Sequence, residues 1–219
     1  MCKTLVQTED VTLKAGKAAL QAALTVPEGA EGLVIFVHGS GSSRFSPRNR
    51  AVASHLNEGS LATLLLDLLT MDEQRADEYT GHLRFNIPFL AARVQGAIDW
   101  AVQHERTRGL KTGLFGASTG AAAALVAAAE RPEAVHAVVS RGGRPDLAVD
   151  ALPNVKAPVL LIVGGADTPV IEMNRSAAQH ISAEHRIEIV PGATHLFEEK
   201  GALEAVAELA REWFSHYLA

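Results

Sequence analysis

The chain has 219 residues, of which 47% are hydrophobic and 21% are charged, as expected for one globular domain with a substantial core. A net charge of −5 and a pI near 6.0 argue against nucleic acid or an anionic membrane as the main partner. No stretch approaches the ~18 uninterrupted apolar residues of a membrane helix. Residues 1–17 also lack the apolar centre of a signal peptide. Cys2 is the single cysteine, which excludes an internal disulfide and favours a reducing, cytoplasmic compartment.

The elements alternate along the chain between apolar strands and helices. Weak alternation over residues 11–13 and 18–26, around Gly16, predicts an opening hairpin. Apolar runs that predict strands cover residues 32–37, 61–66, 111–115, 135–140, 158–163 and 186–190. Helices are predicted over residues 47–58, 88–104, 121–130, 170–181 and 201–218. This order predicts a single α/β domain over residues 1–219, a three-layer sandwich around a mostly parallel, twisted sheet of about eight strands.

Residues 67–86 form a long polar connection between a strand and a helix. It is the only segment long enough to cover part of a site, and no gap in the sequence could hold a separate lid domain. We therefore expect an open site that takes small substrates.

The pentapeptide Gly-Ala-Ser-Thr-Gly at residues 116–120 has the form G-x-S-x-G, between a short apolar strand and an Ala-rich helix. In that context the pattern predicts a nucleophile elbow, a sharp turn that exposes the central serine. The flanking glycines remove Cβ atoms that would clash at such a turn. Ser118 is thus the candidate nucleophile, although a Gly-rich turn of this kind can also be purely structural.

A serine hydroxyl needs a base, and a histidine base needs a carboxylate to orient it. His195 lies in a Gly-containing loop between the last predicted strand and the last helix. Asp167 directly follows a strand and precedes Thr-Pro, so it is either the third triad member or a helix N-cap. The chain order Ser118, Asp167, His195 is the order of α/β hydrolases and favours the triad. His38 comes too early for that order, and we interpret it as an anchor of its loop.

An acyl-transfer site also needs backbone N–H groups that face the developing oxyanion. One candidate donor is Thr119, which follows the nucleophile at the start of a helix. The second comes from loop 38–43, where Ser40 is the first choice and Gly41 is close behind. Phosphate binding is the rival interpretation of this loop, but no Gly-Lys-Ser/Thr follows it.

Taken together, residues 38–41, 116–120, 164–167 and 192–195 resemble the α/β-hydrolase superfamily over nearly the whole chain. In size the chain resembles the dienelactone-hydrolase-like branch, although dienelactone hydrolases proper use a cysteine where Ser118 stands. The resemblance implies a serine esterase that cleaves small carboxylic esters or lactones through an acyl-enzyme, without metal or organic cofactor. Acyl transfer by the same triad, or a binding protein that merely retains the fold, remain the alternatives.

Loop residues supply the candidate substrate contacts. Gly41 lets the backbone of loop 38–43 approach a substrate closely. Five arginines lie in loops that could face the site and hold a carboxylate or phosphate, or could simply be solvated. These arginines are Arg44, Arg48, Arg84, Arg141 and Arg144. Arg141 is the best placed of them, because it follows a strand at the predicted active edge.

Overall fold

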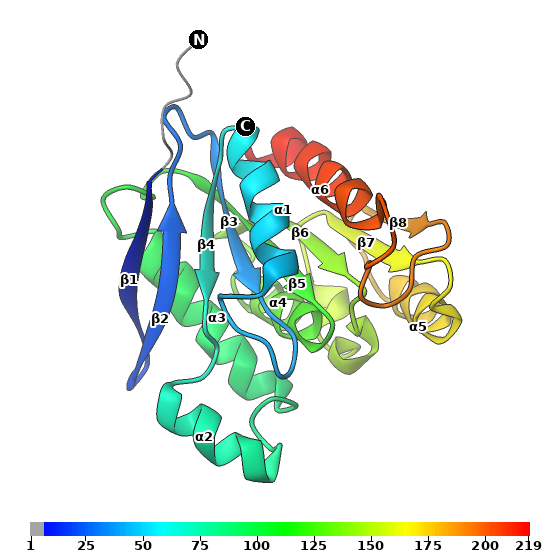
Figure 1. The fold of residues 1–219 in the computed structure, drawn as a ribbon, viewed down its shortest axis with the longest axis horizontal. Coiled ribbons are helices and arrows are strands. Elements are labelled where there is room, and N and C mark those ends of the chain that lie inside the picture. Colours follow the sequence, from blue (N-terminus) through cyan, green and yellow to red (C-terminus); the bar gives the residue numbers. More distant parts are fainter. Residues whose placement is uncertain (1–6) are drawn as a thin grey trace.

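The computed structural model describes residues 7–219 and shows an α/β sandwich (Figure 1). Cys2 lies outside the described residues. Over the described part, the strands are β1 (Thr8–Ala15), β2 (Ala18–Thr25), β3 (Gly32–Val37), β4 (Leu61–Leu66), β5 (Lys111–Ala117), β6 (Val135–Arg141), β7 (Val159–Gly164) and β8 (His185–Val190). The helices are α1 (Pro47–Glu58), α2 (Met71–Thr80), α3 (Ile87–Ala101), α4 (Thr119–Glu130), α5 (Thr168–Ala178) and α6 (Ala202–Leu218), with short 3-10 turns η1 (Pro145–Ala148) and η2 (Leu152–Asn154).

The strands form one eight-stranded sheet in the order β1-β2-β4-β3-β5-β6-β7-β8. The β1–β2 and β2–β4 pairs are antiparallel, and every pair from β4 to β8 is parallel. The predicted mostly parallel sheet of about eight strands is therefore confirmed. Because β3 to β8 run in one direction, the loops that follow them gather at one edge.

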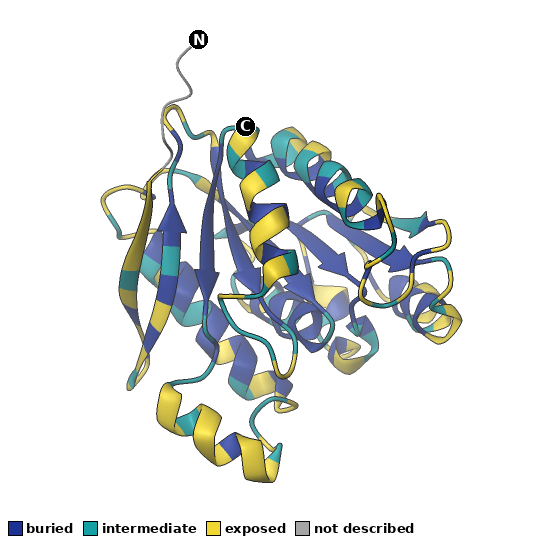
Figure 2. Ribbon diagram, in the orientation of Figure 1, coloured by how far each residue is buried: buried dark blue, intermediate teal, exposed yellow. Residues whose placement is uncertain are grey.

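Helices cover both faces of the sheet, as Figure 1 shows. The α3 and α4 helices pack on one face, where Leu33, Ile35 and Leu114 of the strands meet the alanines of α4. The α1 and α6 helices pack on the other face, around Phe36 and Phe115. The central strands are buried along their whole length (Figure 2), which explains their continuous apolar runs.

The long polar connection predicted over residues 67–86 contains a helix, α2, that was not predicted from the sequence. Thr70 accepts a hydrogen bond from the N–H of Glu73, and the Glu73 side chain accepts one from the N–H of Thr70, which makes a capping box. Gly81 ends the helix in the left-handed conformation. Most of α2 is exposed (Figure 2), so it carries no apolar periodicity that would have revealed it. It is a short insertion, and residues 7–219 contain no separate lid domain.

Over residues 7–219, no helix combines the length and the apolar content that a bilayer crossing requires.

Candidate active site

The four loops singled out in the sequence meet at the carboxyl edge of the sheet. Loop 38–43 follows β3, Ser118 follows β5, Asp167 follows β7 and His195 follows β8. Parallel strands that end at one edge bring their loops together, and reacting groups gather there in open α/β sheets. The sheet topology therefore places residues from distant parts of the chain at one rim.

Ser118 occupies the turn between β5 and α4 with φ 51° and ψ −123°. A positive φ is unfavourable for a residue with a side chain, and the surrounding hydrogen bonds hold it in place. Its N–H donates to the carbonyl oxygen of Arg141 at 3.2 Å. Its own carbonyl oxygen accepts from the N–H groups of Ala121 and Arg144, each at 3.1 Å. This is the geometry of an elbow that holds one side chain out from the turn.

The two glycines of the pentapeptide are required by close backbone contacts. A Cβ at Gly116 would lie 2.4 Å from the Cα of Ala121, and one at Gly120 would lie 2.3 Å from the carbonyl oxygen of Val37. Real Cβ atoms do not approach other atoms so closely. The prediction that these glycines remove clashes is confirmed, and α4 begins directly against the end of β3.

His195 and Asp167 are joined directly. The Nδ1 of His195 lies 2.7 Å from the Oδ2 of Asp167. Asp167 stands at the N-cap of α5 but makes no capping hydrogen bond with its side chain. The carboxylate is thus committed to the imidazole, and the N-cap alternative is not what this residue does. With Nδ1–H donating to the carboxylate, Nε2 is left as the basic nitrogen.

Ser118 and His195 make no hydrogen bond with one another in the described structure. They flank the same short stretch of backbone, however. A Cβ at Gly142 would meet the His195 carbonyl oxygen at 3.2 Å and its Cε1 at 3.6 Å. Gly142 follows Arg141, whose carbonyl oxygen accepts from Ser118. Contacts between a nucleophile and its base are often loose without substrate.

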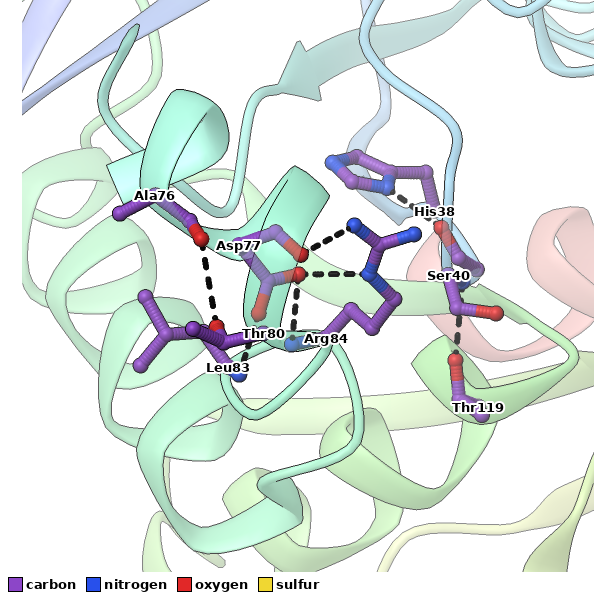
Figure 3. A network of polar contacts seen from close by, with 9 residues as sticks. His38, Ser40, Ala76, Asp77, Thr80, Leu83, Arg84 and Thr119 are labelled. Carbon is purple, nitrogen blue, oxygen red and sulfur yellow. Dashed lines mark hydrogen bonds and ion pairs between the residues drawn. The ribbon is translucent and has the colours of Figure 1, made fainter. Parts of the chain in front are cut away.

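Loop 38–43 is held against the elbow by its own polar groups. The N–H of Ser40 donates to the Oγ1 of Thr119 at 3.0 Å (Figure 3). The hydroxyl of Thr119 thus occupies the donor that the sequence assigns to an oxyanion. Ser40 is exposed and Thr119 is 5% exposed, so this hydrogen bond joins the surface of the loop to the buried start of α4. Gly41 adopts φ +70° at the exposed tip of the loop.

His38 anchors this loop and has a defined tautomer. Its Nδ1 lies 2.9 Å from the carbonyl oxygen of Gly39, and its Nε2 accepts from the N–H of Leu68 at 3.1 Å. The first contact requires a proton on Nδ1 and the second a lone pair on Nε2, so the ring is neutral. Burial lowers the pKa of His38, which agrees with the neutral form. Both nitrogens are occupied, which fits the role of an anchor.

A cavity of about 240 Å³ opens beside the loop, lined by His38, Gly41, Asp67, Asp77, Arg84 and Leu90 among others. Arg84 extends from the segment after α2 toward His38 and Ser40 (Figure 3). Its Nε donates to Asp77 at 2.6 Å. Burial raises the pKa of Asp77, but hydrogen bonds from Arg84 and from the N–H of Leu83 outweigh it and lower the pKa. Asp77 belongs to α2, and the capping box of Thr70 and Glu73 is the sequence signal that could have revealed this helix.

The loop arginines divide by their partners. Arg44 pairs with Asp67, Arg48 with Glu198, Arg84 with Asp77 and Arg144 with Asp146. Within residues 7–219, Arg141 forms no ion pair with a carboxylate. Four of the five predicted loop arginines therefore have a carboxylate partner within the described residues.

The sheet order, the strained serine turn and the carboxylate–imidazole pair define the α/β-hydrolase fold class. Comparison with known proteins narrows the class, because the model of the dienelactone hydrolase family matches residues 20–218. The chain belongs to the dienelactone hydrolase family. A dienelactone hydrolase from Anabaena variabilis ATCC 29413 is 59% identical with a TM-score of 0.97, over 99% of this chain and 100% of that chain. Est1E from Butyrivibrio proteoclasticus has a TM-score of 0.79 at 18% identity, over 94% of this chain and 98% of that one, which shows the fold alone.

Two curated relatives carry a name that does not describe a hydrolase. Two proteins of Mycobacterium tuberculosis, each named "Putative phosphoribosyl transferase", are 52% identical over 210 residues. The match covers 96% of this chain but 46% of each relative. The chain thus spans about half the length of the curated relatives it matches.

Proposed function

We propose that this chain is a serine hydrolase that cleaves small carboxylic esters or lactones through an acyl-enzyme intermediate. The observation that carries the proposal is the 2.7 Å contact between His195 and Asp167 beside the strained turn at Ser118. Membership in the dienelactone hydrolase family supports a hydrolase, and the finer assignment is our proposal from the side chains at the edge of the sheet.

In the first half-reaction, Nε2 of His195 takes the proton of the Ser118 hydroxyl as its oxygen attacks the substrate carbonyl carbon. Asp167 holds the imidazole in the tautomer that leaves Nε2 free and stabilises the imidazolium that forms. The imidazolium then gives its proton to the leaving alcohol. In the second half-reaction, His195 activates water, which releases the acid and restores the serine.

The tetrahedral intermediate carries negative charge on the former carbonyl oxygen. The N–H of Thr119, in the first turn of α4, and the N–H of Ser40 are the proposed donors to that oxygen. In the free chain the Ser40 N–H is bound to the Thr119 hydroxyl at 3.0 Å. The oxyanion would therefore replace that hydroxyl as the acceptor. Each such donor is typically worth ~10²–10³ in rate.

The substrates we propose are small esters whose cleavage needs no cofactor, and they bind beside loop 38–43. The cavity of about 240 Å³ is close to the lower limit of ligand pockets and is open at the exposed Gly41. No metal or organic cofactor takes part in the proposed steps. We place the protein in the cytoplasm, since a single cysteine in 219 residues fits a reducing compartment.

Two alternatives use the same fold. In the first, an alcohol or amine replaces water and the chain is an acyltransferase. In the second, the fold binds a ligand without chemistry. The phosphoribosyl transfer named for the mycobacterial relatives belongs to proteins about twice as long, and we assign it to no residue of this chain.

The test is hydrolysis of 4-nitrophenyl acetate by the wild type and by Ser118→Ala, with Ser176→Ala as the control. Ser176 lies on the exposed face of α5, so its loss should leave the rate unchanged. We expect Ser118→Ala to abolish turnover while circular dichroism shows an intact fold. Undiminished turnover in Ser118→Ala would overturn the proposal. Product analysis with added alcohol or amine separates hydrolysis from acyl transfer.

A further inference from the structure

Arg141, the last residue of β6, is the most buried arginine of the described chain, at 8% exposure. Its Nη2 makes one long contact, 3.4 Å to the Oδ1 of Asn49. Its Nε and Nη1 are buried and have no hydrogen-bond partner among residues 7–219. The Phe197 ring lies 5.9 Å from the guanidinium carbon. The N–H groups of a buried guanidinium normally donate hydrogen bonds, so these unpartnered donors need an explanation.

Arg93 shows how the same protein treats another buried arginine. Arg93 is 9% exposed, and it donates to the carbonyl oxygen of Ala15 at 3.1 Å and to Glu73 at 2.5 Å. A buried charge is tolerated when it is paired in this way and is costly when it is not. Burial and the nearby charge of Arg48 lower the pKa of Arg141 to about 10, so it still carries its charge at neutral pH. Arg141 is thus a buried cation without a counter-ion among residues 7–219.

Arg48 adds a second positive charge to the same place. It stands in the first turn of α1, where the helix dipole is also positive. Its Nη1 donates to the carboxylate of Glu198 at 3.0 Å, while its Nε is buried without a partner. Glu198 is 64% exposed on its side chain and Arg48 is 35% exposed, so this pair lies at the surface. Ion pairs as exposed as this one are weak and readily exchange partners.

The cluster lies directly beside the candidate active site. The carbonyl oxygen of Arg141 accepts the N–H of Ser118, and the next residue, Gly142, packs against His195. Phe197, which covers the guanidinium, belongs to the same loop as His195. Phe197 has φ 56°, which is strained for a bulky residue. The loop segment that packs over Arg141 is therefore strained at Phe197. The next residue, Glu198, ties this segment to α1 through its ion pair with Arg48.

We propose that Arg141, Arg48 and Asn49 form a subsite for a phosphoryl group carried by the ester substrate. This inference rests on the proposed function, because it places the group beside Ser118. Three buried nitrogens without a partner among residues 7–219 (Nε and Nη1 of Arg141 and Nε of Arg48) and two positive charges match the three oxygens and the charge of about −1.5 to −2 of a phosphate monoester. Glu198 pairs with Arg48 while no phosphoryl group is bound, and the phosphoryl group displaces Glu198 on binding.

The binding test is calorimetric titration of the full chain with inorganic phosphate at constant ionic strength, with acetate as the comparison. We expect saturable binding of phosphate and at least tenfold weaker binding of acetate. Arg141→Met should weaken phosphate binding at least tenfold, since it removes charge-assisted hydrogen bonds. Arg106→Gln is the control, because Arg106 pairs with the exposed Glu9 far from this site.

A second variant keeps the test decisive if Arg141→Met does not fold. Glu198→Gln removes the competing carboxylate from an exposed position and should tighten phosphate binding severalfold. Absence of saturable phosphate binding in the wild type would overturn the subsite, as would looser binding by Glu198→Gln. Acetate binding as tight as phosphate binding would overturn the assignment to a phosphoryl group.

The substrate test compares the 4-nitrophenyl esters of phosphoglycolic acid and of propionic acid. We expect a higher kcat/KM for the phosphorylated ester in the wild type, and at least a tenfold fall in the ratio of the two values in Arg141→Met. A ratio that does not change would overturn the subsite while leaving the esterase intact. If the proposed function itself is wrong, Ser118→Ala keeps full activity on both esters, and the calorimetric result still reports on the anion site separately.

Discussion

The two halves of the candidate active site are prepared to different degrees. On one side, Asp167 and His195 are joined at 2.7 Å and need no substrate to hold them. On the other side, Ser118 is held in a strained turn, and the Ser40 N–H is bound to Thr119. The candidate base is thus already paired with its carboxylate, whereas one proposed oxyanion donor is bound to the hydroxyl of Thr119 in the free chain.

The chemistry of the groups explains this difference. An imidazole and a carboxylate form a charge-assisted pair that is stable throughout the reaction cycle. An oxyanion exists only during the reaction, so in the resting state its donors bind another acceptor, either a protein group or water. The Thr119 hydroxyl is the acceptor that this chain provides.

The largest predicted effect comes from removing the nucleophile. Ser118→Ala should lower kcat for 4-nitrophenyl acetate by about 10⁴-fold or more, because the residues of such a site act as a unit. Stopped assays at high enzyme concentration would measure the residual rate. A loss smaller than tenfold would mean that another group carries out the attack.

The paired candidate base is tested by Asp167→Asn, which keeps the size of the side chain but removes the charge. We expect a fall in kcat of about 10³–10⁴-fold, since the amide no longer selects the tautomer with a free Nε2. Asp99→Asn is the matched control, because Asp99 pairs with Arg131 at the surface. Equal rates for the two variants would show that the contact between Asp167 and His195 is only structural.

The bound oxyanion donor is tested by Thr119→Val, which removes the hydroxyl and keeps the shape. The Ser40 N–H then loses its protein acceptor in the free chain. Because Ser40 is exposed and water can replace the hydroxyl, the free energy of unfolding should fall by only about 0.5–1.5 kcal/mol. The substrate oxygen no longer competes with the hydroxyl, and kcat/KM should rise about 2–10-fold. A fall in kcat/KM would indicate instead that the hydroxyl holds loop 38–43 in its working position.

The smallest predicted effect concerns the anchor of that loop. Burial lowers the pKa of His38 below its unfolded value of 6.5, so below pH 6.5 the unfolded chain takes up a proton that the folded chain refuses. Stability from this residue is therefore complete above pH 6.5. It is lost as the pH falls toward the folded pKa, by at most about 1.4 kcal/mol per pH unit.

Urea titrations at several pH values would measure this loss. In His38→Gln the stability should be lower at pH 7 but should depend less on pH between 6.5 and 5. An unchanged slope would show that other groups cause the pH dependence, and that the His38 ring accepts a proton while it is folded.

Local patterns predicted most of the fold. The range 47–58 for α1 matched the observed helix, because Pro47 opens it and Gly59 follows its end. The elbow was equally visible, since only glycine fits the two contacts at Gly116 and Gly120. The α2 helix was missed, because an exposed helix has no apolar stripe and its capping box was the only signal.

Contacts between distant parts of the chain were beyond sequence patterns. The Ser40 N–H meets a hydroxyl 79 residues away, and Arg48 meets Glu198 across 150 residues. Neither residue type alone indicates such a partner. That no carboxylate of the described chain pairs with Arg141 was equally hidden, because pairing depends on which side chains the fold brings beside it. Sequence order predicted which loops meet, but not how their polar groups pair.

The most direct test of the central claim is labelling with a fluorophosphonate probe followed by mass spectrometry of the digested chain. An activated serine displaces the fluoride and keeps the phosphonyl group, whereas an ordinary hydroxyl does not react. We predict one adduct per chain, located on Ser118, and none in Ser118→Ala. Unlabelled wild-type protein, or an adduct on a different residue, would contradict the claim that Ser118 is the nucleophile.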